Sequence, residues 1–273
     1  MHEAFLSFLQ AIILGIVQGL TEFLPVSSSG HLVIFEHLLG TSLDSINFDV
    51  FAHTGTLLSV IIYYRHQIAS VFSDIMNNST RRGTASPSDS DISPAWVWYI
   101  IIATIPAGIM GLLFEDYITT AFKSIRLVGC ILLFCGLLLI STKWVRTGNR
   151  KLRLTDAILI GIAQAFAIAP GLSRSGTTIS MGLFRKINPK SAADFSFLLS
   201  IPAVAGATVL KTKTVLAAVP PADEILNYAV GAITSFIIGY LSISLLLRMV
   251  QKGKFFYFGI YCFLIGTAVL IFV

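Results

Sequence analysis

Long apolar runs alternate with short polar segments along almost the whole chain. Six of the runs are about 20 residues long, the length at which a helix crosses the hydrocarbon core of a bilayer. They lie at residues 48–64, 95–114, 126–142, 194–213, 225–247 and 255–273. Two further apolar regions, about 4–40 and 155–187, are broken by Pro, Gly and Ser. The pattern predicts about six membrane-spanning helices and two interrupted segments.

The two interrupted segments contain the same motif. Gly15 to His31 reads GIVQGLTEFLPVSSSGH, and Gly161 to Thr177 reads GIAQAFAIAPGLSRSGT. Aligned without a gap, the identical pairs are Gly15 and Gly161, Ile16 and Ile162, Gln18 and Gln164, Ser27 and Ser173, Ser29 and Ser175, and Gly30 and Gly176. Broken apolar segments at corresponding positions of two halves are the best sequence indication of a polar site near the bilayer midplane.

Composition supports a membrane protein. Hydrophobic residues make up 55% of the chain and charged residues only 12%, and the mean hydropathy is +0.82. A soluble domain of ordinary composition carries about twice as much charge. The three cysteines, Cys130, Cys135 and Cys262, all lie in predicted spans. We therefore expect free thiols there, with neither a disulfide nor a metal cluster.

The basic charge predicts an orientation. With the loops 65–94, 143–153, 185–190 and 248–254 on one side, that side holds 14 of the 19 Lys and Arg residues. By the positive-inside rule this side is cytoplasmic. The formal charge of +5 and the pI near 9.2 thus indicate orientation, and we expect no nucleic-acid partner.

This orientation works only if each interrupted segment enters and leaves the membrane on the same side. Residues 4–40 then form a re-entrant helix hairpin from outside, and residues 155–187 form one from the cytoplasm. We expect one all-α polytopic domain over residues 1–273, an inverted repeat with halves at about 1–145 and 146–273. Irregular backbone at membrane depth must be buried in protein or line a wet cavity, so the two hairpin tips should meet inside the bundle.

The ionisable residues of these segments define a candidate site. Gln18 and Glu22 are four residues apart and share one helix face. Serines before a helix cap its free amides, and a helix N-terminus attracts anions. The second turn adds Arg174, whose guanidinium can bind phosphate in a bidentate way. We predict a phosphate cradle at the two turns, lined by Ser27, Ser29, Gly30, Ser173, Ser175, Gly176 and Thr177.

Each of these residues also has a purely structural interpretation. Glu22 and Arg174 could form a structural ion pair, and His31 could be a satisfied core histidine. Ser before a helix is often only a cap. For Asp49 and His53 the structural interpretation is the favoured one, because Asp49 opens a predicted span and His53 lies inside it with no partner in the repeat.

Three motifs resemble those of the undecaprenyl-diphosphate phosphatase family of the bacitracin-resistance (BacA) type. They are the (Glu/Gln)xxxE element from Gln18 to Glu22, PVSSSGH from Pro25 to His31, and PGLSRSGTT from Pro170 to Thr178. The resemblance extends over essentially the whole chain. It implies hydrolysis of undecaprenyl diphosphate in the bacterial plasma (inner) membrane, with the site facing outward and a divalent cation, Mg²⁺ or Ca²⁺, required.

The resemblance also implies roles for individual residues. The functional residues carried over are Glu22, Ser28, His31 and Arg174, and the metal ligands are Glu22 and Gln18. Many members of the family have Glu where this chain has Gln18. The family pattern admits Gln at that position, but the substitution leaves one fewer carboxylate for the metal.

Two functions follow as hypotheses. The leading one is a phosphatase that recycles the lipid carrier of cell-wall synthesis, with His31 as general base on Ser28 or on a water. The alternative is a transporter or flippase of lipid phosphates, which would need no cluster of Glu22, Ser28 and His31. The expected partners are a polyprenyl diphosphate lipid and membrane lipids, and the apolar surface is compatible with a homodimer.

Overall fold

The structure is a computed structural model that describes residues 2–39, 45–76, 92–122, 124–217 and 222–272. In these ranges the regular elements are helices, apart from one isolated β-bridge between Arg150 and Ile187. The helices are α1 (His2–Phe23), α2 (Ser28–Leu39), α3 (Ser45–Tyr63), α4 (Arg65–Met76), α5 (Ala95–Leu113), α6 (Glu115–Phe122), α7 (Ile125–Ser141), η1 (Thr142–Trp144), α8 (Leu154–Phe166), α9 (Arg174–Phe184), α10 (Pro189–Ala217), α11 (Ala222–Gln251) and α12 (Tyr257–Phe272). The expected all-α fold is confirmed.

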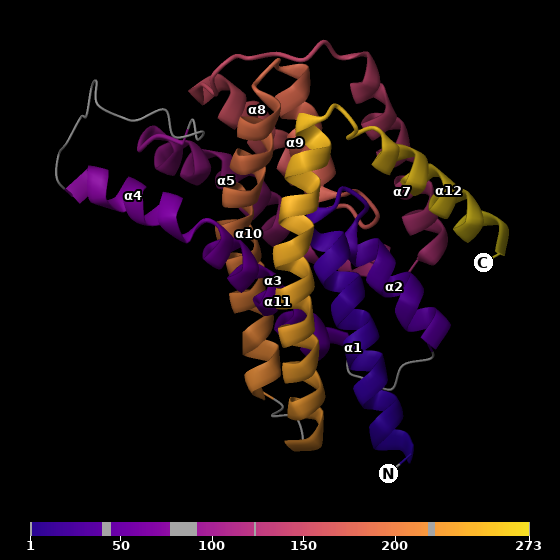
Figure 1. Cartoon of the computed structure of the whole chain (residues 1–273). Helices are drawn as coiled ribbons and strands as arrows, with labels where there is room; N and C mark the ends of the chain where they lie inside the picture. The colour runs from indigo at the N-terminus through magenta and orange to yellow at the C-terminus, as the bar shows by residue number, and fades with distance from the viewer. Residues whose placement is uncertain (1, 40–44, 77–91, 123, 218–221, 273) are drawn as a thin grey trace.

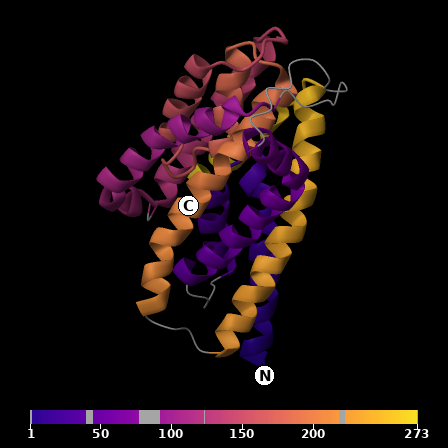
Figure 2. The same cartoon turned by 90° about the vertical axis from the view of Figure 1, so that its left-hand side faces the viewer.

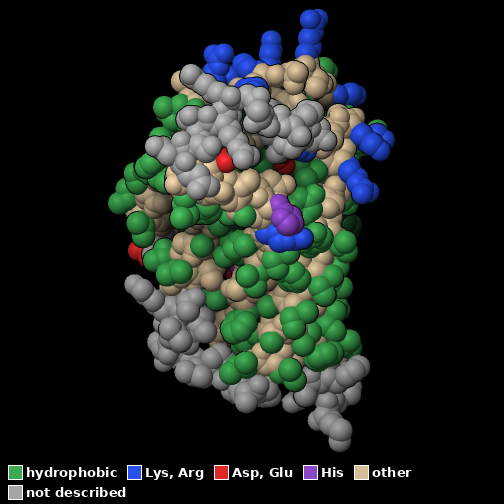
Figure 3. Space-filling model, turned by 60° about the vertical axis from the view of Figure 1, so that its left-hand side comes forward, with side chains coloured by type: hydrophobic (Ala, Val, Ile, Leu, Met, Phe, Trp, Pro, Cys, Tyr) green, Lys and Arg blue, Asp and Glu red, His purple; other side chains and the backbone are tan. Residues whose placement is uncertain are grey.

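Each predicted span coincides with a helix, namely α3, α5, α7, α10, α11 and α12. Four described helices are long and apolar enough to cross a membrane: Ala95–Leu113, Ile125–Trp144, Pro189–Lys211 and Glu224–Gln251. Large apolar side chains of α5 stay exposed in the monomer, and hydrophobic side chains cover much of the middle of the molecule (Figure 3). Such a surface belongs in lipid, and the protein is a multi-pass membrane protein.

Two helices were not expected from the sequence. The polar loop predicted at 65–94 begins with α4, and α6 lies between two predicted spans. Along α4, Ile68, Val71, Phe72 and Ile75 recur at helical spacing and form one apolar face, the pattern of an amphipathic helix. Residues 77–91 of the same loop lie outside the described residues.

The two interrupted segments fold as helix hairpins that approach each other from opposite ends of the molecule. Helices α1 and α2 form the first hairpin and α8 and α9 the second, and their turns face each other near the middle (Figures 1 and 2). Helix α11 packs along α1 and α3. A Cβ on Gly15 would lie 2.7 Å from the Gly231 carbonyl oxygen, so α1 and α11 approach closely because Gly15 lacks a side chain.

The basic residues gather at one end of the molecule. Lys and Arg side chains project from that end in Figure 3. The connections from η1 to α8, from α9 to α10 and from α11 to α12 all lie there (Figure 1). This is the grouping of loops on which the predicted orientation depends.

Candidate active site

The two hairpin turns end in the same cap. In the first, the Ser27 hydroxyl accepts a hydrogen bond from the Gly30 amide at 3.3 Å, and the Ser27 carbonyl accepts one from the His31 amide at 3.1 Å. In the second, the Ser173 hydroxyl accepts from the Gly176 amide at 3.1 Å. Ser27 has φ 71, a conformation that L residues seldom adopt. The predicted capping role of both serines is confirmed.

The two turns touch each other, as expected. The Ser175 hydroxyl donates to the Leu24 carbonyl oxygen at 3.5 Å. A Cβ on Gly176 would lie 3.2 Å from the Pro25 Cβ. In the second turn, Gly171 has φ 93 and a Cβ there would lie 2.7 Å from the Val128 carbonyl oxygen, so this position requires glycine.

Glu22 lies at the centre of the site. Its Oε1 accepts from Arg174 Nη2 at 2.7 Å, and its Oε2 accepts from Ser28 Oγ at 2.7 Å and from Gln18 Nε2 at 3.1 Å. The side chain is 7% exposed and that of Arg174 is 15% exposed. A buried carboxylate is tolerated when it is paired and hydrogen-bonded in this way. The structure thus brings together Gln18, Glu22, Ser28 and Arg174.

The partners of Glu22 occupy equivalent positions of the repeat. Ser28 is the first residue of α2, and Arg174 is the first residue of α9. Both helices therefore direct their N-termini toward one carboxylate. The positive ends of two helix dipoles and one guanidinium make the place attractive to anions.

Several residues of the predicted cradle use their hydroxyls within the turns. Thr177 Oγ1 donates to the Ser173 carbonyl oxygen at 2.8 Å, and the Ser173 and Ser175 hydroxyls lie 3.2 Å apart. Ser27 acts as a cap, and Ser29 is half-buried beside it. The groups best placed for an incoming phosphate are the side chains of Ser28 and Arg174 and the first amides of α2 and α9.

His31 has partners other than those expected. Its Nδ1 lies 2.9 Å from the Ser27 carbonyl oxygen, and its Nε2 lies 2.9 Å from the Tyr261 hydroxyl. A carbonyl only accepts, so Nδ1 carries the proton and the tyrosine hydroxyl donates to Nε2. The rings stack with centroids 5.6 Å apart. We expected His31 to act as a base on Ser28 or on a water; among the described contacts Ser28 pairs with Glu22 and not with His31.

Two neighbours of the site were missed by sequence reasoning. Tyr261 carries no signal in the sequence, since it is one of several aromatic residues in the last span. His53 was interpreted as structural, yet its Nε2 lies 3.7 Å from Glu22 Oε2. Its spacing of four residues from Asp49 was visible, but the helix face that points to the site was not.

The donor set fits a cation only if a substrate completes the coordination. Within the described chain no group of three or more His, Cys, Asp or Glu side chains could hold a metal ion. Gln18 contacts the Glu22 carboxylate through Nε2, and its Oε1 is buried and has no hydrogen-bond partner. Mg²⁺ is usually held by one or two carboxylates together with phosphate oxygens of the substrate, so the two residues fit.

The second hairpin is anchored at its far end by a buried carboxylate, Asp156. Arg150 binds both of its oxygens at 2.8 Å, Arg185 Nε donates to Oδ1 at 2.9 Å, and the Arg153 amide donates to Oδ2 at 3.0 Å. Burial alone would raise the pKa of Asp156, but the hydrogen bonds from Arg150, Arg185 and Arg153 outweigh it and hold the pKa below its usual range.

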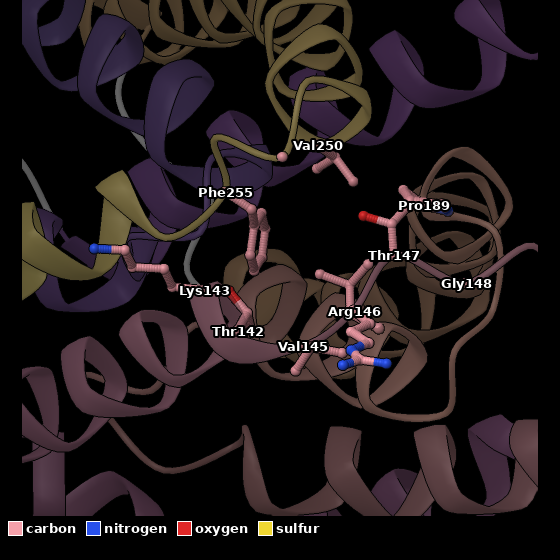
Figure 4. Close-up of a pocket in the computed structure, with 11 residues that line it drawn as sticks. Thr142, Lys143, Val145, Arg146, Thr147, Gly148, Pro189, Val250 and Phe255 are labelled. Carbon is pink, nitrogen blue, oxygen red and sulfur yellow. The ribbon is translucent and has the colours of Figure 1, made fainter.

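A pocket of about 130 Å³ lies at the basic end, between the segment that follows α7 and the end of α11 (Figure 4). Its lining includes Thr142, Arg146, Val250 and Phe255. None of the residues predicted for the phosphate or metal site lines it. It is therefore separate from the hairpin turns.

The fold and the site together define a multi-pass helical membrane protein with a buried ionic centre between two helix hairpins. The family described as bacitracin resistance protein BacA matches residues 11–268, and the chain belongs to this family. It is 38% identical to undecaprenyl-diphosphatase 1 of Shouchella clausii (strain KSM-K16), over 98% of this chain and 97% of that protein. It is 42% identical to the undecaprenyl-diphosphatases of Korarchaeum cryptofilum (strain OPF8), over 96% and 97% of the two chains, and of Alkaliphilus metalliredigens (strain QYMF), over 96% and 98%.

Proposed function

We propose that this protein hydrolyses undecaprenyl diphosphate to undecaprenyl phosphate and inorganic phosphate and so recycles the lipid carrier of cell-wall synthesis. Relatives that share almost its full length carry the name undecaprenyl-diphosphatase. One structural observation carries the proposal: the Ser28 hydroxyl is 2.7 Å from a carboxylate that also holds the Arg174 guanidinium at 2.7 Å. The proposed nucleophile, its proton acceptor and a phosphate-binding cation thus lie next to one another. The transporter alternative requires no such arrangement and is not supported.

The site binds the substrate through its diphosphate. Arg174 and the free amides at the starts of α2 and α9 take the phosphate oxygens. Phosphoryl transfer depends mostly on positioning the groups and stabilising charge on the transferring phosphoryl. Because Glu22 holds both Ser28 and Arg174, it fixes the nucleophile relative to the phosphate-binding group.

The reaction then proceeds in two balanced steps. Ser28 Oγ attacks the terminal phosphorus, the bridging P–O bond breaks, and undecaprenyl phosphate leaves with the bonding electrons. The proton of the Ser28 hydroxyl passes to Glu22 Oε2. A water next attacks the phosphoserine and passes one proton to the phosphate oxygens, the Oγ–P bond breaks, inorganic phosphate leaves, and Glu22 returns its proton to Ser28 Oγ. His31 acts as a positioning residue, since both of its ring nitrogens hold the turn and Tyr261.

A divalent cation, Mg²⁺ or Ca²⁺, belongs to this proposal. Glu22 and Gln18 would hold it together with the diphosphate oxygens. When bound it would neutralise charge on those oxygens. The unpartnered Oε1 of Gln18 supports this assignment.

The proposed membrane arrangement is the one expected from the sequence. Residues 1–273 form a single domain in the bacterial plasma membrane, with three spans following each of two re-entrant hairpins of opposite orientation. The basic end lies in the cytoplasm, and the site faces outward. Support comes from the basic residues at one end and from the opposite approach of the two hairpins.

Phosphate release from undecaprenyl diphosphate by the purified protein in detergent tests the function. We expect release with Mg²⁺, none with EDTA, and no change in Lys252→Ala, an exposed residue at the basic end. No release from long or short prenyl diphosphates, by folded protein that still binds the headgroup, would overturn the phosphatase. Trapping a phosphoserine at residue 28 supports the covalent route, and direct water attack follows if Ser28→Ala keeps near-wild-type turnover.

A further inference from the structure

Helix α4 carries an apolar face that the described part of the chain leaves mostly exposed. At about 3.6 residues per turn, its apolar half consists of Ile68, Val71, Phe72, Ile75 and Met76. Its polar half includes His66, Ser70, Ser73 and Asp74. Val71 is 8% exposed, whereas Phe72 is 58% and Met76 86% exposed. The bundle therefore buries one edge of the apolar face and leaves the other edge uncovered.

The start of α4 is fixed at the basic end of the bundle. Only Tyr64 separates α3 from α4, and its carbonyl oxygen accepts a hydrogen bond from the Ile68 amide at 2.9 Å. Tyr64 is buried, and its hydroxyl donates to Asp194 Oδ1 at 2.7 Å. Asp194 lies in the second turn of α10, beside the connection from α9 at the basic end. Helix α4 thus leaves the side of the bundle from an anchored point (Figure 1).

This point lies at a boundary of the membrane. Helix α3 is a predicted span and ends where α4 begins. The next predicted span, α5, exposes Trp98 in its first turn, and Trp is enriched at the level of the lipid headgroups. Hydrophobic side chains cover the molecule below the basic end (Figure 3). The uncovered edge of α4 therefore continues the surface that faces lipid.

We propose that α4 lies in the plane of the leaflet at the basic end and inserts Phe72, Ile75 and Met76 among the lipid chains. The polar half, with Ser70 and Ser73, faces water. Amphipathic helices at the membrane interface lie in this way, with the apolar face below the headgroups. Arg65 and Asp74 are the basic and the acidic residue of α4, so apolar insertion rather than net charge holds the helix on the leaflet.

Carbene footprinting of the wild-type protein in phosphatidylcholine vesicles tests the proposal without any substitution. One photoreactive reagent is dissolved in the lipid and a second in the water, and mass spectrometry locates the modified side chains. We expect the ratio of lipid-phase to water-phase labelling to be at least about 5-fold higher at Phe72, Ile75 and Met76 than at Ser70 and Ser73.

A spin label on α4 measures the depth of insertion. The label is attached to Met76→Cys in protein whose three native cysteines are replaced by Ala, and gel filtration verifies that this protein is folded. Collisions with oxygen and with a water-soluble nickel chelate should place the label about 5–10 Å below the headgroup boundary. Adding Phe72→Asp should move the label toward water, whereas the matched Ser73→Asp, which adds the same charge to the polar half, should leave its depth unchanged.

Three results would overturn the proposal. Equal labelling of both halves by the water-phase reagent would mean that α4 projects into water. Protection of Phe72, Ile75 and Met76 from both reagents would mean that protein, such as a second copy of the chain, covers the apolar face. A spin label at residue 76 that collides freely with the nickel chelate in folded protein would exclude insertion as well.

Discussion

The two helix hairpins share a serine cap and differ in chemistry. The Ser27 and Ser173 hydroxyls cap their helices by accepting a hydrogen bond from the backbone amide three residues later in the chain. Yet where the first hairpin has Glu22, the aligned residue of the second is the apolar Ile168. The acidic centre therefore exists in one half only. Its partner Arg174 comes from the other half, so neither half contains a complete site.

The hairpins are also fixed in different ways. The first is held near its turn by His31 and Tyr261. The second is held at its far end by the pair of arginines on Asp156. The two halves of the repeat thus contribute different groups to the proposed site. The first half supplies the nucleophile and the carboxylate, and the second supplies the guanidinium of Arg174 from an anchored hairpin.

Removing Arg174 breaks the link between the halves and should have the largest effect. Arg174→Ala removes the phosphate ligand and leaves Glu22 buried without its cation. We expect kcat/KM for phosphate release to fall about 1000-fold or more. Arg174→Lys should recover part of this, because a point charge replaces the bidentate group.

The kcat/KM values of Arg174→Ala and Arg174→Lys are compared at the same concentration of folded protein, which gel filtration in detergent measures. Retention of more than about a tenth of the wild-type kcat/KM in Arg174→Ala would show that the second hairpin does not supply the phosphate-binding cation.

Ser28→Ala tests the chemistry of the first hairpin. We expect kcat to fall about 1000-fold, because the proposed nucleophile is lost. The neighbouring Ser29→Ala should cost less than about 10-fold, since Ser29 contributes to the cradle through its amide as well as its side chain. Turnover of each variant and trapping of the phosphoenzyme distinguish them. Equal losses would assign both serines to phosphate binding.

The sequence predicted the helices and the two serine caps better than it predicted contacts between helices that are distant in the chain. Apolar runs of spanning length gave the positions of six helices, and the serine and glycine pattern gave both caps. Glu22 and Arg174 were found because ionisable residues are costly in apolar segments. Tyr261 was not found, because it meets His31 across 230 residues. Which face of α3 or α12 turns to the site depends on packing, so the approach of His53 to Glu22 was not predicted.

The contact between His31 and Tyr261 gives a more moderate test. If His31 only positions the turn, His31→Ala should lower kcat about 10- to 30-fold, and Tyr261→Phe should lower it about 3-fold, because the phenol hydrogen bond alone is lost. Phosphate release of both variants and of the double variant measures their coupling. A general-base role of His31 on Ser28 predicts instead a loss as large as that of Ser28→Ala and no effect of Tyr261→Phe.

Asp156→Asn should loosen the second hairpin without touching the chemistry. The carboxylate is buried and bound by two arginines. The substitution should therefore lower the free energy of unfolding by about 2 kcal/mol and the melting temperature by about 5 °C. Because the pKa of Asp156 is lowered in the folded protein, its contribution is complete above the unfolded pKa of about 4 and is lost as the pH falls through the lower folded value.

Melting curves in detergent between neutral pH and about pH 3 measure this contribution. The wild type should lose stability over that range by more than Asp156→Asn does. Parallel curves for the two proteins would mean that the ion pairs of Asp156 do not stabilise the hairpin.

The smallest effects concern Gln18 and its repeat partner Gln164, which occupy the same position in the two halves. Both are buried, but only Gln18 adjoins a carboxylate. Gln18→Ala should weaken Mg²⁺ activation about 3- to 10-fold, and Gln18→Glu should preserve activity. Neither amide atom of Gln164 has a hydrogen-bond partner, so Gln164→Met should leave Mg²⁺ activation unchanged and raise the melting temperature slightly. Loss of activity in Gln18→Glu would remove Gln18 from the metal site, whereas equal weakening at both positions would mean that the amides act through packing. If only the substitutions of Gln18 weaken Mg²⁺ activation, then both halves of the repeat retain the glutamine but only the first half uses it at the metal site.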